Sequence, residues 1–535
     1  MTDDKGSRRL TFWILAVIGI LYFCALIPFN LTGAETPDML EVFEVDEYAQ
    51  YPHVIRMLTP GDGAYQTLRN FFIYLHYYYG YPFYFWSAVS ILPLKLFGMI
   101  RLENTRVIIC VLRQMLSVLP MILSAGLLTR VVTKFRQIIP SVVLYVLLLT
   151  MPAVLQNDLW WHPDSLTLLF LSLTFFFLDK DELRCGRFYL LAAAACGAAV
   201  GTKYLGLYFA LSIPAYLVCC LIRGTINFRQ LLIKAGLFLL VMAAFILISD
   251  PLLLLPQERA EIIGIMKQQT ELSGTGIFLR YDSTFLENGY LPGWLTENYL
   301  KSPWLILSVI GLLVSLFLRK DPKRQTTAVV LFFYLLTACI VNLNAAASRM
   351  HYYLPILIPL GAQMLHLTSV VPERYRKAAS MLLCLIMAVQ IGINLKTDTG
   401  LMKTHLHREE TSGSIALYKT LESEYLPLPE VPAERMTRVF RDWKAYFPEQ
   451  EGYAVETDWE LGSFAFMEEW HPDLILLEKE NIRAYSSASV LDSAVNTDRM
   501  RDAVEFYSAA AEKQLPGYGF LLENEFGVVF RKEAQ

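Results

Sequence analysis

The chain has 535 residues, of which 55% are hydrophobic and only 18% are charged, and its mean hydropathy is positive. These figures exclude a disordered or nucleic-acid-coating protein and argue against an ordinary soluble enzyme. The net charge of −4 is unevenly distributed, because residues 396–535 hold 26 of the 50 acidic and 15 of the 46 basic residues. This segment carries −11 and the remainder +7, which predicts a basic membrane body followed by an acidic, water-soluble domain.

Apolar runs of about 20 residues, the length that a helix needs to cross a bilayer, recur through residues 1–395. With a cytoplasmic N-terminus, clusters of Lys and Arg fall on the inner ends of these runs, as the positive-inside rule requires. We therefore predict a mainly α fold: a polytopic membrane bundle of about eleven transmembrane helices, followed by a small extracytoplasmic α/β domain at residues 396–535. The predicted spans are 11–31, 107–130, 138–154, 164–179, 187–203, 205–222, 231–250, 303–319, 326–342, 350–371 and 378–395.

Two long segments are predicted to face the outside, residues 32–106 and 251–302. In the first of them, residues 46–58 and 82–98 predict two helices that lie on the membrane surface. Between these helices, residues 71–86 contain eleven aromatic side chains. The aromatic run forms either an interfacial belt or a stacking wall for a sugar or a polyprenyl chain.

The second external segment is too long for a simple connection between two spans. It is predicted to be either a mobile lid or a plain acidic loop, and a lid would shield a reactive site from water. Its candidate hinges are Gly274, Gly276, Gly289 and Gly293.

Few polar residues stand at the outer ends of the predicted spans. Asp164 opens a span at the edge of the hydrocarbon, where carboxylates tend to be functional. Lys203 and Arg349 lie on the side that the positive-inside rule disfavours, although cations at helix ends also snorkel to headgroups. The other members of this rim are Asp46, Glu47, His162 and His351.

Carboxylates and cations at one rim of a membrane body match the chemistry of transfer from a lipid-linked phosphate donor. In such a reaction, cations hold the phosphate and a carboxylate accepts the proton of the incoming hydroxyl. The plainer interpretation, that the carboxylates are only solvated helix caps, stays open at this point.

Six segments also resemble a known family, in the same order and on the same predicted faces. The chain is similar to the GT-C membrane glycosyltransferases, and within them to the dolichyl-phosphate-mannose protein mannosyltransferases and the lipid A aminoarabinose transferases. The resemblance covers residues 1 to about 395. The segments are VDEYAQYPHVIRML, YPFYFWSAVSILPLKLFG, VLRQMLSVLPMILSAGLLTRVV, WHPDSLTLLFLSLTFFFL, AAVGTKYLGLYFAL and SRMHYYLPILIPL.

The resemblance implies an acidic pair in the first external loop, Asp46 and Glu47, with the aspartate as the catalytic base. It implies a second acidic residue at the start of the fourth span, Asp164, and a Thr-Lys pair at the end of the fifth, Thr202 and Lys203. The catalytic candidates are therefore Asp46, Glu47 and Asp164.

The donor phosphate is expected to be bound by Lys203, Arg349 and His351. An acidic pair could also hold Mg²⁺ or Mn²⁺ together with the donor phosphate, which makes Asp46 and Asp164 candidate metal ligands; no other cofactor is expected. The relatives often carry Lys-Pro-Pro where this chain has Gly80, Tyr81 and Pro82. Further candidates for substrate contact are His53, Tyr81, Arg113, His162 and Tyr352.

Together, these features predict transfer of a glycosyl group from a polyprenyl-phosphate-linked donor to an acceptor hydroxyl at the extracytoplasmic face, by an inverting single displacement. The expected partners are the lipid-linked donor, a lipid, glycan or protein acceptor, and membrane lipids of a bacterial plasma membrane, without nucleic acid. The alternatives are a lipid or solute transporter and a non-catalytic scaffold. A transporter would need ionisable or helix-breaking residues near the middle of several spans, and here the polar residues gather at one rim.

Overall fold

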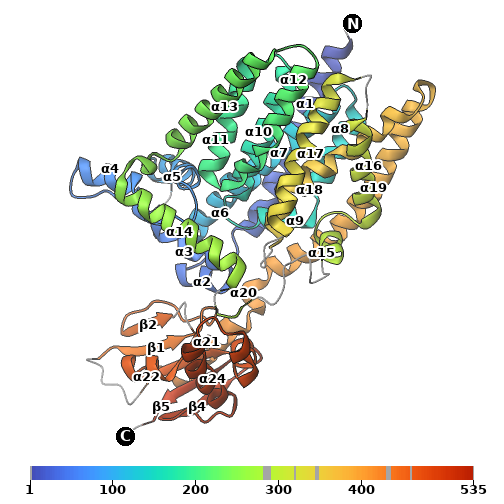
Figure 1. Cartoon of the computed structure of the whole chain (residues 1–535). Helices are drawn as coiled ribbons and strands as arrows, with labels where there is room; N and C mark the ends of the chain where they lie inside the picture. The colour runs from blue at the N-terminus through green and yellow to red at the C-terminus, as the bar shows by residue number, and fades with distance from the viewer. Residues whose placement is uncertain are drawn as a thin grey trace.

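A computed structural model describes residues 3–99, 101–276, 278–280, 291–317, 321–343, 349–428, 435–457 and 461–533. It consists of a large helical bundle with a small sheet-containing domain at one end, while the N-terminus lies at the opposite end (Figure 1). The predicted fold class, a mainly α membrane bundle with a small C-terminal domain, is therefore confirmed.

Each predicted span coincides with one helix or with a run of consecutive helices. Within the described residues, seven helices are long and apolar enough to cross a membrane, or eight when the bent pair Ile138–Leu149 and Pro152–Asp158 is taken as one span. The chain is thus an integral multi-pass membrane protein, whereas the number eleven remains a prediction. The bundle comprises α1 (Asp3–Asn30), α6 (Thr105–Arg113), η1 (Gln114–Val118), α7 (Leu119–Thr133), α8 (Ile138–Leu149), α9 (Pro152–Asp158), α10 (Asp164–Asp181), α11 (Arg187–Thr202), η2 (Tyr204–Ala210), α12 (Ser212–Ile222), α13 (Phe228–Ser249), α16 (Ser302–Leu316), α17 (Pro322–Leu343), η4 (Met350–Tyr353), α18 (Leu354–Gly361), η5 (Ala362–Val370) and α19 (Glu373–Leu406).

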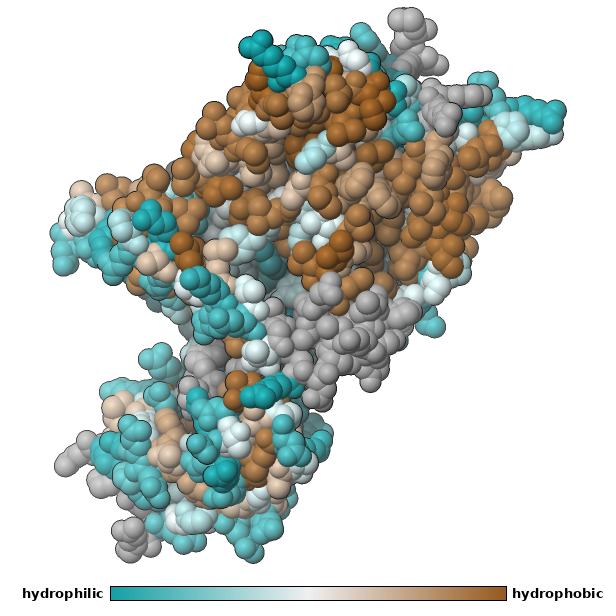
Figure 2. Space-filling view, in the orientation of Figure 1, coloured by the Kyte–Doolittle hydropathy of each residue, from teal (hydrophilic) through white to brown (hydrophobic). Residues whose placement is uncertain are grey.

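Apolar and hydrophilic side chains occupy different parts of the bundle surface. Apolar side chains cover its flank, and hydrophilic side chains gather at the two ends and over the C-terminal domain (Figure 2). Leu232, Leu240 and Ile248 of α13, for example, are all exposed on this flank. Apolar surface of this extent is stable only against lipid.

The first external segment folds into four helices, α2 (Pro37–Phe43), α3 (Val45–Leu58), α4 (Ala64–Phe72) and α5 (Tyr81–Leu96). The helices predicted at residues 46–58 and 82–98 correspond to α3 and α5. Their inner faces share an apolar core with α6, built around Val54, Phe83 and Ile108.

The second external segment contains η3 (Pro251–Leu254), α14 (Pro256–Thr275) and α15 (Leu291–Asn298). Residues 277 and 281–290, with the predicted hinge Gly289, lie outside the described residues. The lid therefore remains a prediction.

The C-terminal domain contains one five-stranded sheet in the order β2-β1-β3-β5-β4. β1 pairs in parallel with β2 and β3, and β5 pairs antiparallel with β3 and β4. Helix α19 runs without a break through residue 396, so the predicted domain boundary falls inside a helix and remains a prediction. The elements are α20 (Arg408–Thr411), α21 (Gly413–Tyr425), β1 (Thr437–Arg441), β2 (Tyr453–Thr457), α22 (Phe464–Trp470), β3 (Leu474–Glu478), α23 (Lys479–Tyr485), η6 (Ala488–Ser493), α24 (Thr497–Ala511), β4 (Tyr518–Glu523) and β5 (Gly527–Lys532).

Polar contacts fix this domain to α2. Arg441 at the end of β1 forms a buried ion pair with Glu41, and the backbone N–H of Glu449 donates to Asp38 at 2.8 Å. Arg408 lies 3.3 Å from Glu44, in the turn between α2 and α3. The domain therefore helps to hold the start of α3 in place.

Candidate active site

Asp164 is the centre of a buried cluster at the end of the bundle that faces the C-terminal domain. It is the first residue of α10, and its Oδ1 atom lies 2.7 Å from Nζ of Lys203, which directly follows α11. Its Oδ2 atom contacts Nδ1 of His162 and lies 3.9 Å from Nε2 of His351. Four predicted site residues from three separate regions of the chain therefore meet at one carboxylate.

Aromatic rings enclose this cluster. The Trp160 ring stacks on His162 with the ring centres 3.8 Å apart, and the hydroxyl of Tyr79 lies 2.7 Å from Nε2 of His162. The ammonium of Lys203 lies 5.2 Å from the ring centre of Tyr352 and 6.0 Å from that of Tyr79, which is cation–π range. Trp160 and Tyr79 are not among the site residues predicted from the sequence, although Tyr79 belongs to the aromatic run at residues 71–86.

Asp46 lies in the first turn of α3 and is half-buried. Among the residues that the structure describes, none forms a hydrogen bond or an ion pair with its carboxylate. Burial, followed by the charges of Asp46 and Asp164, raises the pKa of Tyr79 far above its usual value. The Tyr79 phenol therefore lies within electrostatic range of both carboxylates, which places Asp46 beside the cluster.

The environment of His162 favours the neutral form of its imidazole. Burial lowers its pKa, against the opposing effects of Asp164 and Asp46. Nδ1 of His162 contacts Oδ2 of Asp164, and Nε2 lies 2.7 Å from the hydroxyl of Tyr79. The ring is therefore held between a carboxylate and a phenol.

Arg349 directly precedes η4 and is exposed. Its charge acts on His351, and its guanidinium has no hydrogen bond or ion pair within the described part of the chain. It is therefore available to an anion next to the cluster.

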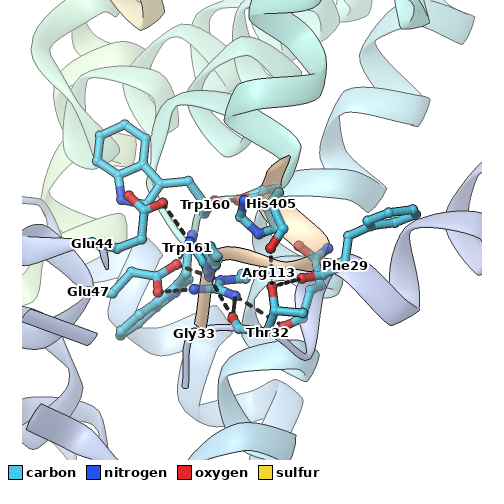
Figure 3. A network of polar contacts seen from close by, with 12 residues as sticks. Phe29, Thr32, Gly33, Glu44, Glu47, Arg113, Trp160, Trp161 and His405 are labelled. Atoms are coloured by element: carbon cyan, nitrogen blue, oxygen red, sulfur yellow. Dashed lines mark hydrogen bonds and ion pairs between the residues drawn. The ribbon is translucent and has the colours of Figure 1, made fainter. Parts of the chain in front are cut away.

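The Glu47 carboxylate, next to Asp46 in the sequence, is bound by protein partners. Arg113 is fully buried with it and donates twice, from Nε to Oε1 at 2.8 Å and from Nη2 to Oε2 at 2.5 Å (Figure 3). The backbone N–H of Trp161 donates to Oε1 at 2.7 Å, and Arg113 also donates to the carbonyls of Asn30 and Thr32. Both side chains are therefore saturated by protein partners, and their direct roles at the substrate remain predictions.

His53 and Tyr81, two further candidates for substrate contact, belong to the aromatic layer of the external segment. The ring of His53 lies 5.0 Å from that of His76, and Nδ1 of His76 lies 2.5 Å from the hydroxyl of Tyr84. Tyr81 is buried at the start of α5, and its ring stacks on Phe72 with the centres 6.0 Å apart. Within the described part of the chain, no hydrogen bond or ion pair joins either side chain to Asp164, so this geometry does not bring them into the cluster.

A glycine fixes the aromatic loop against the end of α11. The N–H of Gly80 donates to the carbonyl of Thr202 at 3.1 Å, and a Cβ atom at position 80 would lie 1.6 Å from the carbonyl oxygen of Gly201. A lysine, which the relatives often carry here, has no room at this position. Lys203, the residue next to this contact, is the cation that reaches Asp164.

Three side chains of the cluster could hold a metal ion. Ligand atoms of His162, Asp164 and His351 lie within 4.8 Å of one another, and all three residues are buried. Two imidazoles and one carboxylate suit a divalent transition metal such as zinc. The predicted metal pair was Asp46 and Asp164, and the structure groups Asp164 with the two histidines instead.

Comparison with known proteins gives the fold a wider context. No protein-family model and no curated protein sequence matches the chain. The structure of ArnT from Cupriavidus metallidurans bound to undecaprenyl phosphate is similar with a TM-score of 0.55 and 12% identity, covering 97% of this chain and 98% of that one. The structure of the oligosaccharyltransferase AglB from Archaeoglobus fulgidus, in complex with an inhibitory peptide and a dolichol-phosphate, gives 0.51 and 12%, covering 97% of this chain and 74% of that one. The fold is therefore of the GT-C type, as the resemblance implied.

Proposed function

We propose that this protein transfers a glycosyl group from a polyprenyl-phosphate-linked donor to an acceptor hydroxyl, with Asp46 as the base. One observation carries the proposal: the Asp46 carboxylate has no hydrogen-bond or ion-pair partner among the described residues, and its charge acts on Tyr79 and His162 at the cluster in which Asp164 contacts Lys203. A base and a phosphate clamp are the two components that this reaction needs, because a phosphate is already a good leaving group.

The fold supports the class of donor. Two proteins of this fold were solved with a polyprenyl phosphate, undecaprenyl phosphate in ArnT and a dolichol-phosphate in AglB. By analogy, the donor headgroup enters at the end of the bundle where Asp164 lies, and its tail stays in the lipid. The positive-inside pattern supports an extracytoplasmic position for this end, and the proposed membrane is a bacterial plasma membrane.

In the proposed mechanism, Lys203 and Arg349 bind the donor phosphate. The Asp164 carboxylate holds the ammonium of Lys203 in place. Their attraction offsets part of the desolvation free energy of this ammonium. As the bond between the sugar and the phosphate breaks, negative charge grows on the leaving oxygen, and the two cations stabilise it. The acceptor hydroxyl attacks from the opposite side of the sugar and loses its proton to Asp46, so the anomeric configuration inverts.

A metal ion at His162, Asp164 and His351 would supply further positive charge for the donor phosphate. Asp164 would contribute one carboxylate oxygen to such an ion, and His162 and His351 would contribute one ring nitrogen each. Elemental analysis of the purified protein after zinc addition tests this site without an activity assay. We expect the wild type to retain zinc and His351→Ala to lose it. An equal zinc content in these two proteins would exclude the site.

The main test is turnover by the reconstituted protein with polyprenyl-phosphate sugars, followed as release of free polyprenyl phosphate. Asp46→Asn should lower the rate by about 10²- to 10⁴-fold, the usual contribution of general-base assistance. Asp62→Asn, which changes an exposed carboxylate of the same external segment, is the matched control and should leave the rate unchanged. Turnover by Asp46→Asn close to that of the control would remove Asp46 from this role.

A further inference from the structure

A second polar site lies at the other end of the bundle, far from Asp164. A cavity of about 830 Å³ opens there between the last turns of α7 and α10 and the first turns of α17 and α19. Asp179, which lines it, follows Asp164 by fifteen residues on α10, which corresponds to about 22 Å along the helix. The cavity is therefore separate from the proposed active site.

The lining of this cavity is strongly cationic. Eight Lys and Arg residues line it, against three Asp and Glu residues. Two of the carboxylates are already committed to lysines: Asp179 lies 2.5 Å from Lys134, and Glu182 lies 2.6 Å from Lys323. The remaining carboxylate of the lining is that of Asp321. The carboxylates that line the cavity therefore neutralise only part of the charge of its arginines.

Three arginines of the cavity lining come from different elements of the fold. Arg136 lies between α7 and α8, Arg324 lies in the first turn of α17, and Arg376 lies in the first turn of α19. The charges of Arg136 and Arg376 both act on Arg324 and repel it. Arg324 has a distant contact with Asp321, at 3.8 Å. The guanidinium groups of Arg136 and Arg376 form no hydrogen bond or ion pair with any residue that the structure describes.

Such an arrangement is costly without an anion, because like charges held together repel one another. Positive-inside cations that simply meet lipid headgroups would spread over the rim, whereas these side chains face one cavity. A guanidinium presents paired N–H groups that match the oxygens of a phosphate. The volume is also in the range of cavities that bind small organic ligands.

We propose that this cavity is a binding site for a phosphate-bearing anion, held by Arg136, Arg324 and Arg376 on the cytoplasmic side. The proposal does not depend on glycosyl transfer at the opposite end. The phosphate belongs either to a lipid headgroup of the inner leaflet or to a soluble phosphate compound, and the two sources are separated experimentally.

Two binding experiments on the full-length purified protein test this proposal. Calorimetry with inorganic pyrophosphate measures the soluble source. Native mass spectrometry from nanodiscs that contain phosphatidylglycerol and phosphatidylcholine measures which lipid is retained. Each is carried out on the wild type and on a double variant, Arg136→Gln with Arg376→Gln. The matched control is Arg9→Gln with Lys377→Gln, which removes two exposed cations of the same end that do not line the cavity.

The expected result is at least tenfold weaker binding of one probe to the double variant, with the control close to the wild type. Loss of pyrophosphate binding identifies a soluble phosphate compound. Loss of phosphatidylglycerol retention without any pyrophosphate binding identifies a lipid headgroup. Should the double variant melt well below the wild type, Arg376→Gln alone is compared with Lys377→Gln. Equal binding of both probes to cavity variants and controls would overturn the proposal.

Discussion

Two buried ion pairs of this protein, Glu47 with Arg113 and Asp164 with Lys203, differ in how much of the cation they leave exposed. Glu47 and Arg113 are fully buried, and each makes further hydrogen bonds to backbone groups. Asp164 is equally buried, but the side chain of its partner Lys203 keeps 18% of its surface exposed. The first pair is a closed network that fixes the fold, whereas the second holds a cation that stays partly exposed. Burial of a charge alone therefore does not identify a functional residue.

The closed pair should be the more costly to break. In Arg113→Met, the Glu47 carboxylate stays buried without its partner, which destabilises proteins by about 3–5 kcal/mol. We expect little monodisperse protein, measured by fluorescence-detected size exclusion and thermal melting. Adding Glu47→Leu should restore part of the stability. A variant Arg113→Met that melts like the wild type but fails in turnover would show that Arg113 acts on substrate after all.

The open pair should respond differently. Lys203→Met should also lower the melting temperature, since it removes a cation from the buried Asp164, but by less than Arg113→Met, because the ammonium is only partly desolvated and His162 and His351 still lie beside Asp164. It should bind donor more weakly and turn over about 10²- to 10³-fold more slowly. Donor binding, turnover and melting are compared with those of Lys267→Met, an exposed lysine of α14. Unchanged donor affinity and rate in Lys203→Met would place the phosphate site elsewhere.

The contact between Gly80 and α11 links the aromatic loop to the open pair. Gly80→Ala forces a methyl group against the backbone of Gly201, so loop and helix must separate at a cost of about 1–3 kcal/mol. The melting temperature should fall, and turnover should fall further than in Gly63→Ala, where the methyl group meets open space. Equal turnover of the two variants would mean that this contact does not position Lys203.

The smallest expected effect concerns pH. Burial, followed by the charge of Glu47, raises the pKa of Glu44 to about 7. The folded state then holds this proton more tightly than the unfolded state, so Glu44 favours folding below about pH 4.5 and loses this contribution as the pH rises toward 7. The melting temperature should therefore decline between pH 5 and pH 8, less steeply in Glu44→Gln. Identical slopes for the two proteins would contradict a raised pKa.

Local properties of the sequence were sufficient for the architecture. The positions of the apolar segments, the two surface helices at residues 46–58 and 82–98, and the gathering of Asp46, Asp164, Lys203 and His351 at one rim all follow from hydropathy, periodicity and the placement of charges. Each of these is a property of a segment relative to the bilayer, and it does not require a knowledge of which segments touch.

Only the tertiary structure decided which charges pair. Asp46 and Glu47 are adjacent in the sequence, but consecutive residues of a helix point about 100° apart, so Glu47 meets Arg113 and Asp46 has no partner among the described residues. Glu41 finds its partner Arg441 in the C-terminal domain, and the three arginines of the inner cavity come from separate elements. The sequence determined at which end of the bundle each charged residue lies, because this depends on whether a segment contacts water or lipid. Packing determined which charges are saturated, because that depends on side-chain direction and on neighbours distant in the chain.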